Sequence, residues 1–202
     1  MQARAASDWL GDERQELAGD RILEATRVVL ARDGIRGARM GKIAEEAGCS
    51  RATLYRYFPN KEALLHAYMV HIAEGFQSVI VETLRELRAF DRRIVEAAAV
   101  SVELMQSRDD VAPFFTEEGV GLTAQLTARA AMMRDQLGEH LERESCAKNI
   151  DGRLRDGVAP VEAAEWITRA IFSLATVPIR DRTGAELRAY LEKMLIPPLI
   201  ER

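Results

Sequence analysis

The chain has 202 residues, enough for one large domain or two small ones. It is 48% hydrophobic and 30% charged, with a net charge of −4, which is an ordinary composition for a soluble globular protein. No uncharged apolar run approaches the roughly 18 residues that a membrane span needs, and the N-terminal stretch lacks the apolar core of a secretory signal, so we expect no membrane partner. Two cysteines without CxxC spacing exclude a disulfide framework and favour a cytoplasmic location.

Almost the whole chain is predicted to be helical, because apolar residues recur at helical spacing between glycine, proline and N-capping residues. Residues 1–17 are expected to form a loose arm. The predicted helices then cover about 20–33, 40–47, 51–58, 61–88, 92–107, 122–148, 160–178 and 184–196. A short helix between loops is an open alternative for residues 109–121. No alternating run is long enough to predict a strand, so the expected fold class is all-α.

Four helix starts carry local signals. Ser50 and Asn60 are placed to cap the helices that follow them, and Pro160 suits a first helical position. Thr183 and Glu186 match a capping box.

Basic charge gathers in one stretch. From Arg36 to Lys61 there are six basic and two acidic residues, a net of +4, so the remainder of the chain carries −8. A local basic surface on an acidic protein suits an acidic partner that is touched at one place. A solvated charged face is the alternative interpretation.

The two short helices joined by "AGCS" match a helix-turn-helix. On a helical wheel, Leu54 and Phe58 point to the core and Arg56 lies nearly opposite, between Ala52 and Thr53. Small residues in the middle of a face, with long donors at its edges, suit the DNA major groove. A surface helix with an ordinary charged face is the alternative.

The stretch "IAEEAGCSRATLYRYFPNKEALL" resembles the DNA-binding signature of the tetracycline-repressor (TetR) family of bacterial transcription regulators. The resemblance covers about residues 18–65. It implies a DNA-binding domain of three helices in residues 1–65 and a helical effector-binding and dimerisation domain in 66–202, about nine helices in all.

The resemblance also implies which side chains bind DNA. The family's DNA-contacting positions fall here on Ser50, Arg51, Thr53, Tyr55, Arg56, Tyr57 and Lys61. Family members often carry two threonines before the second helix, where this chain has Ala38 and Arg39. That departure removes a helix cap, and we expect Arg39 to supply the lost phosphate contact instead.

The C-terminal two thirds offer candidates for a dimer interface and a ligand pocket. The helix over 160–178 has two apolar stripes where one would suffice for packing on one side, which favours a dimer over a helix buried within the monomer. The predicted interface residues are Ile167, Ile171, Leu174, Leu187, Leu191 and Met194. Large or flexible apolar residues that could line a pocket are Met105, Phe114, Phe115, Met132, Met133 and Trp166, each of which could equally be plain core.

No signal for catalysis or for a cofactor is present. His66 and His71 lie about 140° apart on a helix and cannot share a metal site, and neither GxSxG nor a P-loop occurs. We therefore predict no enzyme, but a homodimeric regulator of the bacterial cytoplasm, associated with the nucleoid. We expect it to bind a palindromic operator as a repressor that is released by a small apolar or aromatic effector. The alternatives are an effector-independent DNA-binding or protein-recruiting module and, less favoured, an enzyme on a helical scaffold.

Overall fold

The computed structural model describes residues 5–111, 114, 123–176 and 182–201. Their fold is all-α, as predicted, with eight α-helices against the nine or so expected. The helices are α1 (Ala5–Gly37), α2 (Met40–Glu46), α3 (Arg51–Tyr57), α4 (Lys61–Leu84), α5 (Phe90–Ser107), α6 (Thr123–Ser145), α7 (Pro160–Thr176) and α8 (Gly184–Met194). Most of the stretch 109–121, where a short helix was considered, lies outside the described residues.

The predicted loose arm over residues 1–17 differs from the structure, because α1 already begins at Ala5. Residues 5–19 contain alanine, leucine, glutamate and arginine and no proline, and extending an existing helix avoids the cost of nucleation. The expected stop at Gly34 is present as a kink, where the backbone leaves helical geometry at φ 65°.

Local signals located all four helix starts correctly, although the expected chemistry is present at only three of them. The Ser50 hydroxyl accepts a hydrogen bond from the Thr53 amide at 3.0 Å, and the Asn60 side chain accepts one from the Ala63 amide at 2.8 Å. Pro160 is the first residue of α7. These caps satisfy amides that have no partner within their own helices.

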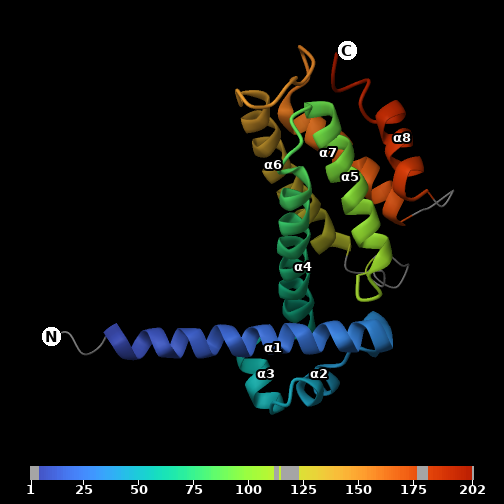
Figure 1. Ribbon diagram of the computed structural model, residues 1–202. Helices are drawn as coiled ribbons and strands as arrows, with labels where there is room; N and C mark the ends of the chain where they lie inside the picture. The colour runs from blue at the N-terminus through green and yellow to red at the C-terminus, as the bar shows by residue number, and fades with distance from the viewer. Residues whose placement is uncertain (1–4, 112–113, 115–122, 177–181, 202) are drawn as a thin grey trace. The chain divides into compact units, whose positions relative to one another are not determined.

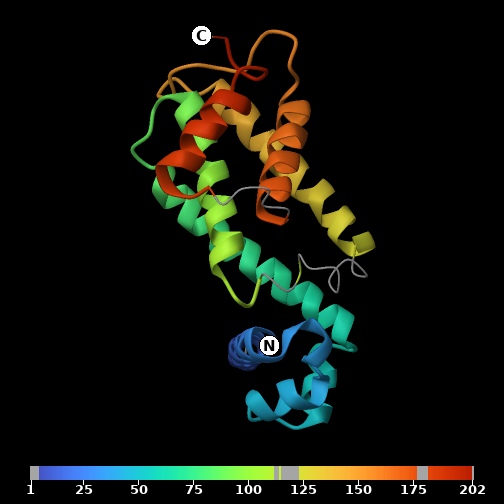
Figure 2. The ribbon, with the colours of Figure 1, turned by 90° about the vertical axis from the view of Figure 1, so that its right-hand side faces the viewer.

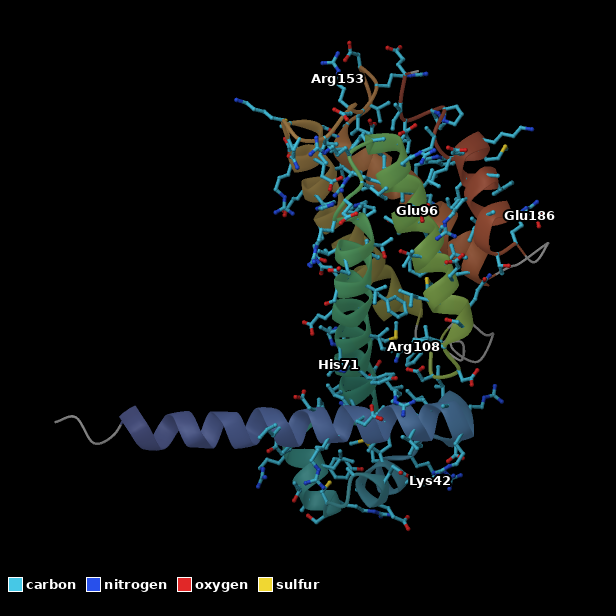
Figure 3. All side chains as sticks on the ribbon, viewed as in Figure 1. Lys42, His71, Glu96, Arg108, Arg153 and Glu186 are labelled. Carbon is cyan, nitrogen blue, oxygen red and sulfur yellow. The ribbon has the colours of Figure 1, made fainter. Side chains whose placement is uncertain are left out.

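The fourth signal, the capping box at Thr183, is wrong in its chemistry. Thr183 is the N-cap of α8, but its side chain forms no capping hydrogen bond. The Gly184 amide instead donates to the Glu103 carboxylate at 3.0 Å. Arg188 of α8 donates to the carboxylates of both Glu103 and Glu96, which are on α5. Glu96 is labelled in Figure 3, where α5 runs beside α8. A residue about 80 positions away therefore replaces the local cap.

The chain divides into two compact units. The N-terminal unit comprises residues 1–74 and 109–114, and the C-terminal unit comprises 75–108 and 115–202. The N-terminal unit thus includes the first half of α4, beyond the residue 65 at which we expected its domain to end. Tyr68 and Ile72 account for the difference, because both lie beyond residue 65 and are buried.

Three helices and the start of a fourth build the N-terminal unit. In Figure 1, α2 and α3 lie together on one side of α1. Their contact faces supply a small apolar core that includes Ile22, Val29, Leu30, Ile43, Ala44 and Leu54, all at most 2% exposed. Arg21 of α1 adds a polar link by donating to the Ala47 carbonyl, at the end of α2, at 3.1 Å.

The C-terminal unit is a bundle in which α5, α6, α7 and α8 surround a second core (Figure 2). Its buried members come from all four helices and include Phe90, Val95, Ala99, Leu141, Ala164, Ile167, Leu187 and Leu191. The helix pair α6 and α7 approaches closely at Gly138, which faces the first residues of α7. A glycine permits that approach because it has no side chain between the backbones.

Helix α4 is long and apolar enough to cross a membrane by length and composition, which the sequence had not led us to expect. Core helices of soluble proteins satisfy the same test. Four apolar side chains in the first half of α4 are buried against protein, so that half serves as a core helix here.

Candidate nucleic-acid interface

The turn between α2 and α3 has the geometry of a helix-turn-helix. Gly48 adopts φ 64°, a left-handed conformation that favours glycine, and ends α2. The amides of Gly48 and Cys49 donate back to the carbonyls of Glu45 and Ala44 at 3.0 and 2.9 Å. Ser50 then caps α3. The sharp reversal places α3 as a separate helix beside α2, where its outer face is free.

The outer face of α3 carries polar side chains around a small centre. Leu54 is fully buried and fixes the inner face, whereas Phe58 is only partly buried. Arg51, Ala52 and Arg56 are exposed, and Tyr55 is 49% exposed.

Of the remaining predicted contacts, Ser50 is exposed, and Thr53 and Tyr57 are half-buried. The Thr53 and Ser50 hydroxyls lie 2.9 Å apart and share a hydrogen bond. The guanidinium of Arg56 lies over the Tyr57 ring, 5.5 Å from its centre. Thus seven consecutive positions, from Ser50 to Arg56, contribute five polar side chains to one end of the N-terminal unit.

Basic side chains near α1 are neutralised by carboxylates. Lys42, labelled on α2 in Figure 3, donates to Asp33 at 2.9 Å, and Arg32 pairs with Asp33 at 3.1 Å. These two hydrogen bonds, that of Lys42 first, lower the pKa of Asp33.

Three other bases have no such partners. Among the described residues, Arg39, Arg51 and Arg56 form no hydrogen bond and no ion pair. Their guanidinium donors remain available to a ligand, and phosphate oxygens or guanine edges are acceptors that suit them.

The start of α2 matches the predicted departure from the family pattern. Ala38 is fully buried, and Arg39 occupies the N-cap position without a side-chain capping bond. Lys61 lies nearby: its ammonium donates to the Ile35 carbonyl, and its pKa is lowered by burial and then by the charge of Arg39. Lys61 therefore ties the start of α4 to the end of α1, a structural role that the sequence did not indicate.

The predicted pocket residues that the structure describes belong to different parts of the chain. Phe114 is buried in the N-terminal unit, where its ring stacks on Tyr68 at 6.3 Å, whereas Met105 is buried in the C-terminal unit. Trp166 is 45% exposed, a position that does not support an internal lining role. Phe115 and the side chains of Met132 and Met133 lie outside what the structure describes.

The predicted dimer residues divide into two groups. Ile167, Leu187 and Leu191 are buried in the core of the single chain, and Ile171 and Leu174 pack against that core. They leave little surface for a partner. Met194 is 53% exposed, and two apolar residues of α7 that the predicted interface did not include, Val161 and Trp166, are also exposed, each at 45%. The Trp166 indole donates to the Leu195 carbonyl at 3.4 Å, which joins the exposed groups of α7 and α8.

Within the described residues, no group of three histidine, cysteine, aspartate or glutamate side chains is arranged to hold a metal ion. The sequence also did not indicate the pairing of Tyr68 with Asp110, in which the Tyr68 hydroxyl donates a buried hydrogen bond in the N-terminal unit. Their separation of 42 positions gave no local signal.

Comparison with known proteins supports the geometric interpretation. The family model of bacterial regulatory proteins of the tetR family matches residues 22–68, which contain the helix-turn-helix. An uncharacterised HTH-type transcriptional regulator of Mycobacterium tuberculosis is 29% identical over 200 residues, covering 96% of this chain and 91% of the relative. The HTH-type transcriptional repressor KstR of Mycolicibacterium smegmatis is 43% identical over 76 residues, covering 38% of this chain and 36% of KstR.

Solved structures share the fold. AibR in complex with isovaleryl coenzyme A and operator DNA superposes with a TM-score of 0.58 at 21% identity, covering 90% of this chain and 99% of AibR. FadR of Bacillus subtilis in complex with stearoyl-CoA gives a TM-score of 0.59 at 19% identity, covering 88% of this chain and 97% of FadR. These structures show the shared fold, whereas the family model over residues 22–68 and the curated relatives support a TetR-family DNA-binding transcriptional regulator.

Proposed function

We propose that the protein is a homodimeric repressor that binds a palindromic operator and is released from it by a small apolar effector. The observation that carries the DNA-binding part is the outer face of α3, where Arg51 and Arg56 lie on either side of the small residue Ala52 and have no hydrogen-bond or ion-pair partner among the described residues. A major groove admits such a helix closely, and its base edges and phosphates accept the donors.

The surface of α7 and α8 supports the dimeric part of the proposal. Trp166 and Met194 are large apolar residues with about half of their surface exposed, and the Trp166 indole donates to the carbonyl of Leu195, the residue that follows Met194. Two copies related by a twofold axis could cover these groups. Two reading helices would then meet two half-sites, so the operator would be palindromic.

The effector proposal draws on the structural neighbours. AibR and FadR are complexed with acyl-CoA thioesters of different acyl length. An acyl chain suits the core of the C-terminal unit, which is rich in leucine, isoleucine and alanine. We further propose that the protein has no enzymatic activity and acts in the cytoplasm, at the nucleoid.

Selection of duplexes from a random pool by the full-length protein tests the proposal. An enriched inverted repeat, whose binding weakens steeply with salt, is the expected result. Isovaleryl-CoA and stearoyl-CoA, with free CoA as the control, are then added to the complex with the enriched duplex. Failure to enrich any sequence would refute the DNA-binding function. Enrichment of a sequence without symmetry would refute the palindromic operator. Operator complexes that persist in both thioesters would favour the effector-independent module.

A further inference from the structure

Gly41 is a glycine that the backbone does not require. It lies in the first turn of α2 with ordinary helical geometry, whereas Gly34 and Gly48 have positive φ angles. Glycine is the least favourable helix residue after proline, so a reason for it must be sought in its surroundings.

The surroundings of Gly41 are occupied by the side chain of Arg51, the first residue of α3. A Cβ atom added to Gly41 would lie 2.5 Å from Nη2 of Arg51 and 3.0 Å from both its Cζ and its Nε. Three heavy atoms of the guanidinium thus lie over the place where a side chain would begin. The Arg51 side chain reaches back across α2 instead of extending outward from α3.

Contact alone holds the guanidinium there. Among the residues described, Arg51 forms no hydrogen bond and no ion pair, so its N–H donors are available to a ligand. Its position against α2 draws it away from the middle of the α3 face, where Ala52 and Arg56 are exposed. A guanidinium at the edge of a groove-facing helix is placed for a backbone phosphate, whereas one in the middle is placed for a base.

We propose that Gly41 is a positioning residue, which by lacking a side chain lets the Arg51 guanidinium lie against α2 and contact a DNA phosphate. This inference rests on the proposed DNA-binding function and adds a residue that does not itself touch DNA. Any side chain at position 41 would displace the guanidinium and weaken the phosphate contact. The effect of such a substitution must therefore depend on the presence of Arg51.

A double-mutant cycle on the full-length protein tests this dependence. Affinity and its salt dependence are measured for wild type, Gly41→Ala, Arg51→Ala and the double variant, on the duplex enriched from a random pool and on a scrambled duplex. Arg51→Ala should weaken binding to both duplexes alike and lower the salt slope by about one per subunit. Gly41→Ala should likewise weaken binding to both duplexes, by several-fold. In a protein that already carries Arg51→Ala, it should cause no further loss of affinity.

Gly19→Ala is the matched control, because Gly19 is in α1 of the same unit with nothing near its added Cβ. Thermal unfolding of all variants separates positioning from folding, and Gly41→Ala should unfold no earlier than wild type. The inference is overturned if Arg51→Ala weakens binding while Gly41→Ala behaves like Gly19→Ala. It is equally overturned if the Gly41→Ala loss persists without Arg51, or if Arg51→Ala has no effect. A wild type that binds no duplex overturns the proposed function together with the inference.

Discussion

At the scale of single residues, substitutions of Arg39 at the N-cap of α2 should affect the stability of the fold and its affinity for DNA in different ways. Arg39 occupies the cap without bonding to the helix amides, and its guanidinium has no hydrogen-bond or ion-pair partner in the described structure. The charge of Arg39 also lowers the pKa of Lys61, after burial, so the two cations are neighbours. An anion bound between them would relieve their repulsion, which makes a DNA phosphate a suitable ligand.

Arg39→Ala should therefore lower affinity on every duplex and reduce the salt slope by about one per subunit, with little change in thermal stability. Arg39→Thr should recover part of the affinity with a shallower salt slope. It should also stabilise the fold by about 0.5–2 kcal/mol, because threonine can cap α2. Salt titrations and thermal unfolding measure the two effects. Unchanged affinity and slope for Arg39→Ala at low salt would make Arg39 simple solvated surface.

Arg56 is expected to behave differently, because it lies in the middle of the outer face of α3, opposite the buried Leu54. Arg56→Ala should cost specificity at one base pair in each half-site, on the order of 1–3 kcal/mol. Competition between the selected duplex and single-base variants measures that loss. Equal losses on selected and scrambled duplexes would remove the base-reading role and leave Arg56 as a phosphate contact.

How far the sequence predicts a residue's role depends on how near its partner is. Ser50 and Asn60 were assigned correctly as caps because each bonds to an amide three residues away. The cap of α8 was missed because Glu103 comes from α5, 81 positions from Gly184. The bond of Lys61 to the Ile35 carbonyl and the contact of Arg51 with Gly41 likewise join separate helices, which no local pattern records.

At the scale of helices, an ion pair fixes the ends of α4, α5 and α6 to one another in the C-terminal unit. Arg93 of α5 donates to both carboxylate oxygens of Glu144 at 3.0 Å, and to the Leu84 and Leu87 carbonyls at 2.6 and 2.7 Å. Burial alone would raise the pKa of Glu144. Hydrogen bonds from His140 and Arg93 outweigh burial and lower that pKa from 4.5 to about 2.

Glu144→Gln should lower the free energy of unfolding by about 3 kcal/mol at neutral pH, because it leaves Arg93 buried with an uncompensated charge. Since the folded-state pKa of Glu144 is depressed, its contribution is present above pH 4.5 and is lost as the pH falls towards 2. Denaturant unfolding of both proteins over that range should show the difference shrinking. Glu142→Gln, on the exposed side of α6, is the matched control. A difference that stays constant with pH would contradict the charge pairing.

The crossing of α6 and α7 gives a second prediction at this scale. A Cβ atom on Gly138 would lie 3.3 Å from the Cα and 3.5 Å from the amide nitrogen of Val161, and backbone atoms cannot move aside as a side chain can. Gly138→Ala should therefore be less stable than wild type by about 1 kcal/mol, despite the better helix propensity of alanine. Gly75→Ala in α4, where the added Cβ meets nothing within 4 Å, should instead add about 0.5–1 kcal/mol. Denaturant unfolding compares them, and equal gains for both would mean that the two helices are free to separate.

Periodicity placed the helices well but could not tell which apolar stripe of α7 is covered. Both stripes have the same spacing, and only the packing of α5, α6 and α8 buries the one that contains Ile167. Trp166, on the other stripe, stays exposed. The interface residues inferred from the sequence therefore included core residues, because burial within one chain and burial between two chains leave the same pattern in a sequence.

At the scale of the whole molecule, the proposed operator binding requires two copies of the chain, and the exposed apolar residues of α7 and α8 are the surface that should join them. Trp166→Glu and Met194→Glu should each yield a folded monomer, because a charge there is solvated in the monomer but would be buried in the dimer. Ile167→Glu should unfold the protein instead, since Ile167 is 3% exposed within one chain. The matched control is Val81→Glu, an equally exposed apolar residue of α4, which should remain dimeric.

Light scattering gives the mass of each variant, circular dichroism its helicity, and binding to the selected duplex its activity. The monomeric variants should bind the palindrome far more weakly than wild type but bind a single half-site almost normally, because the reading helix is intact and only the second contact is lost. That pattern would tie dimerisation to operator recognition. Dimers that survive Trp166→Glu and Met194→Glu but dissociate with Val81→Glu would move the interface to α4. A wild type that is monomeric on the palindrome would refute the dimer itself.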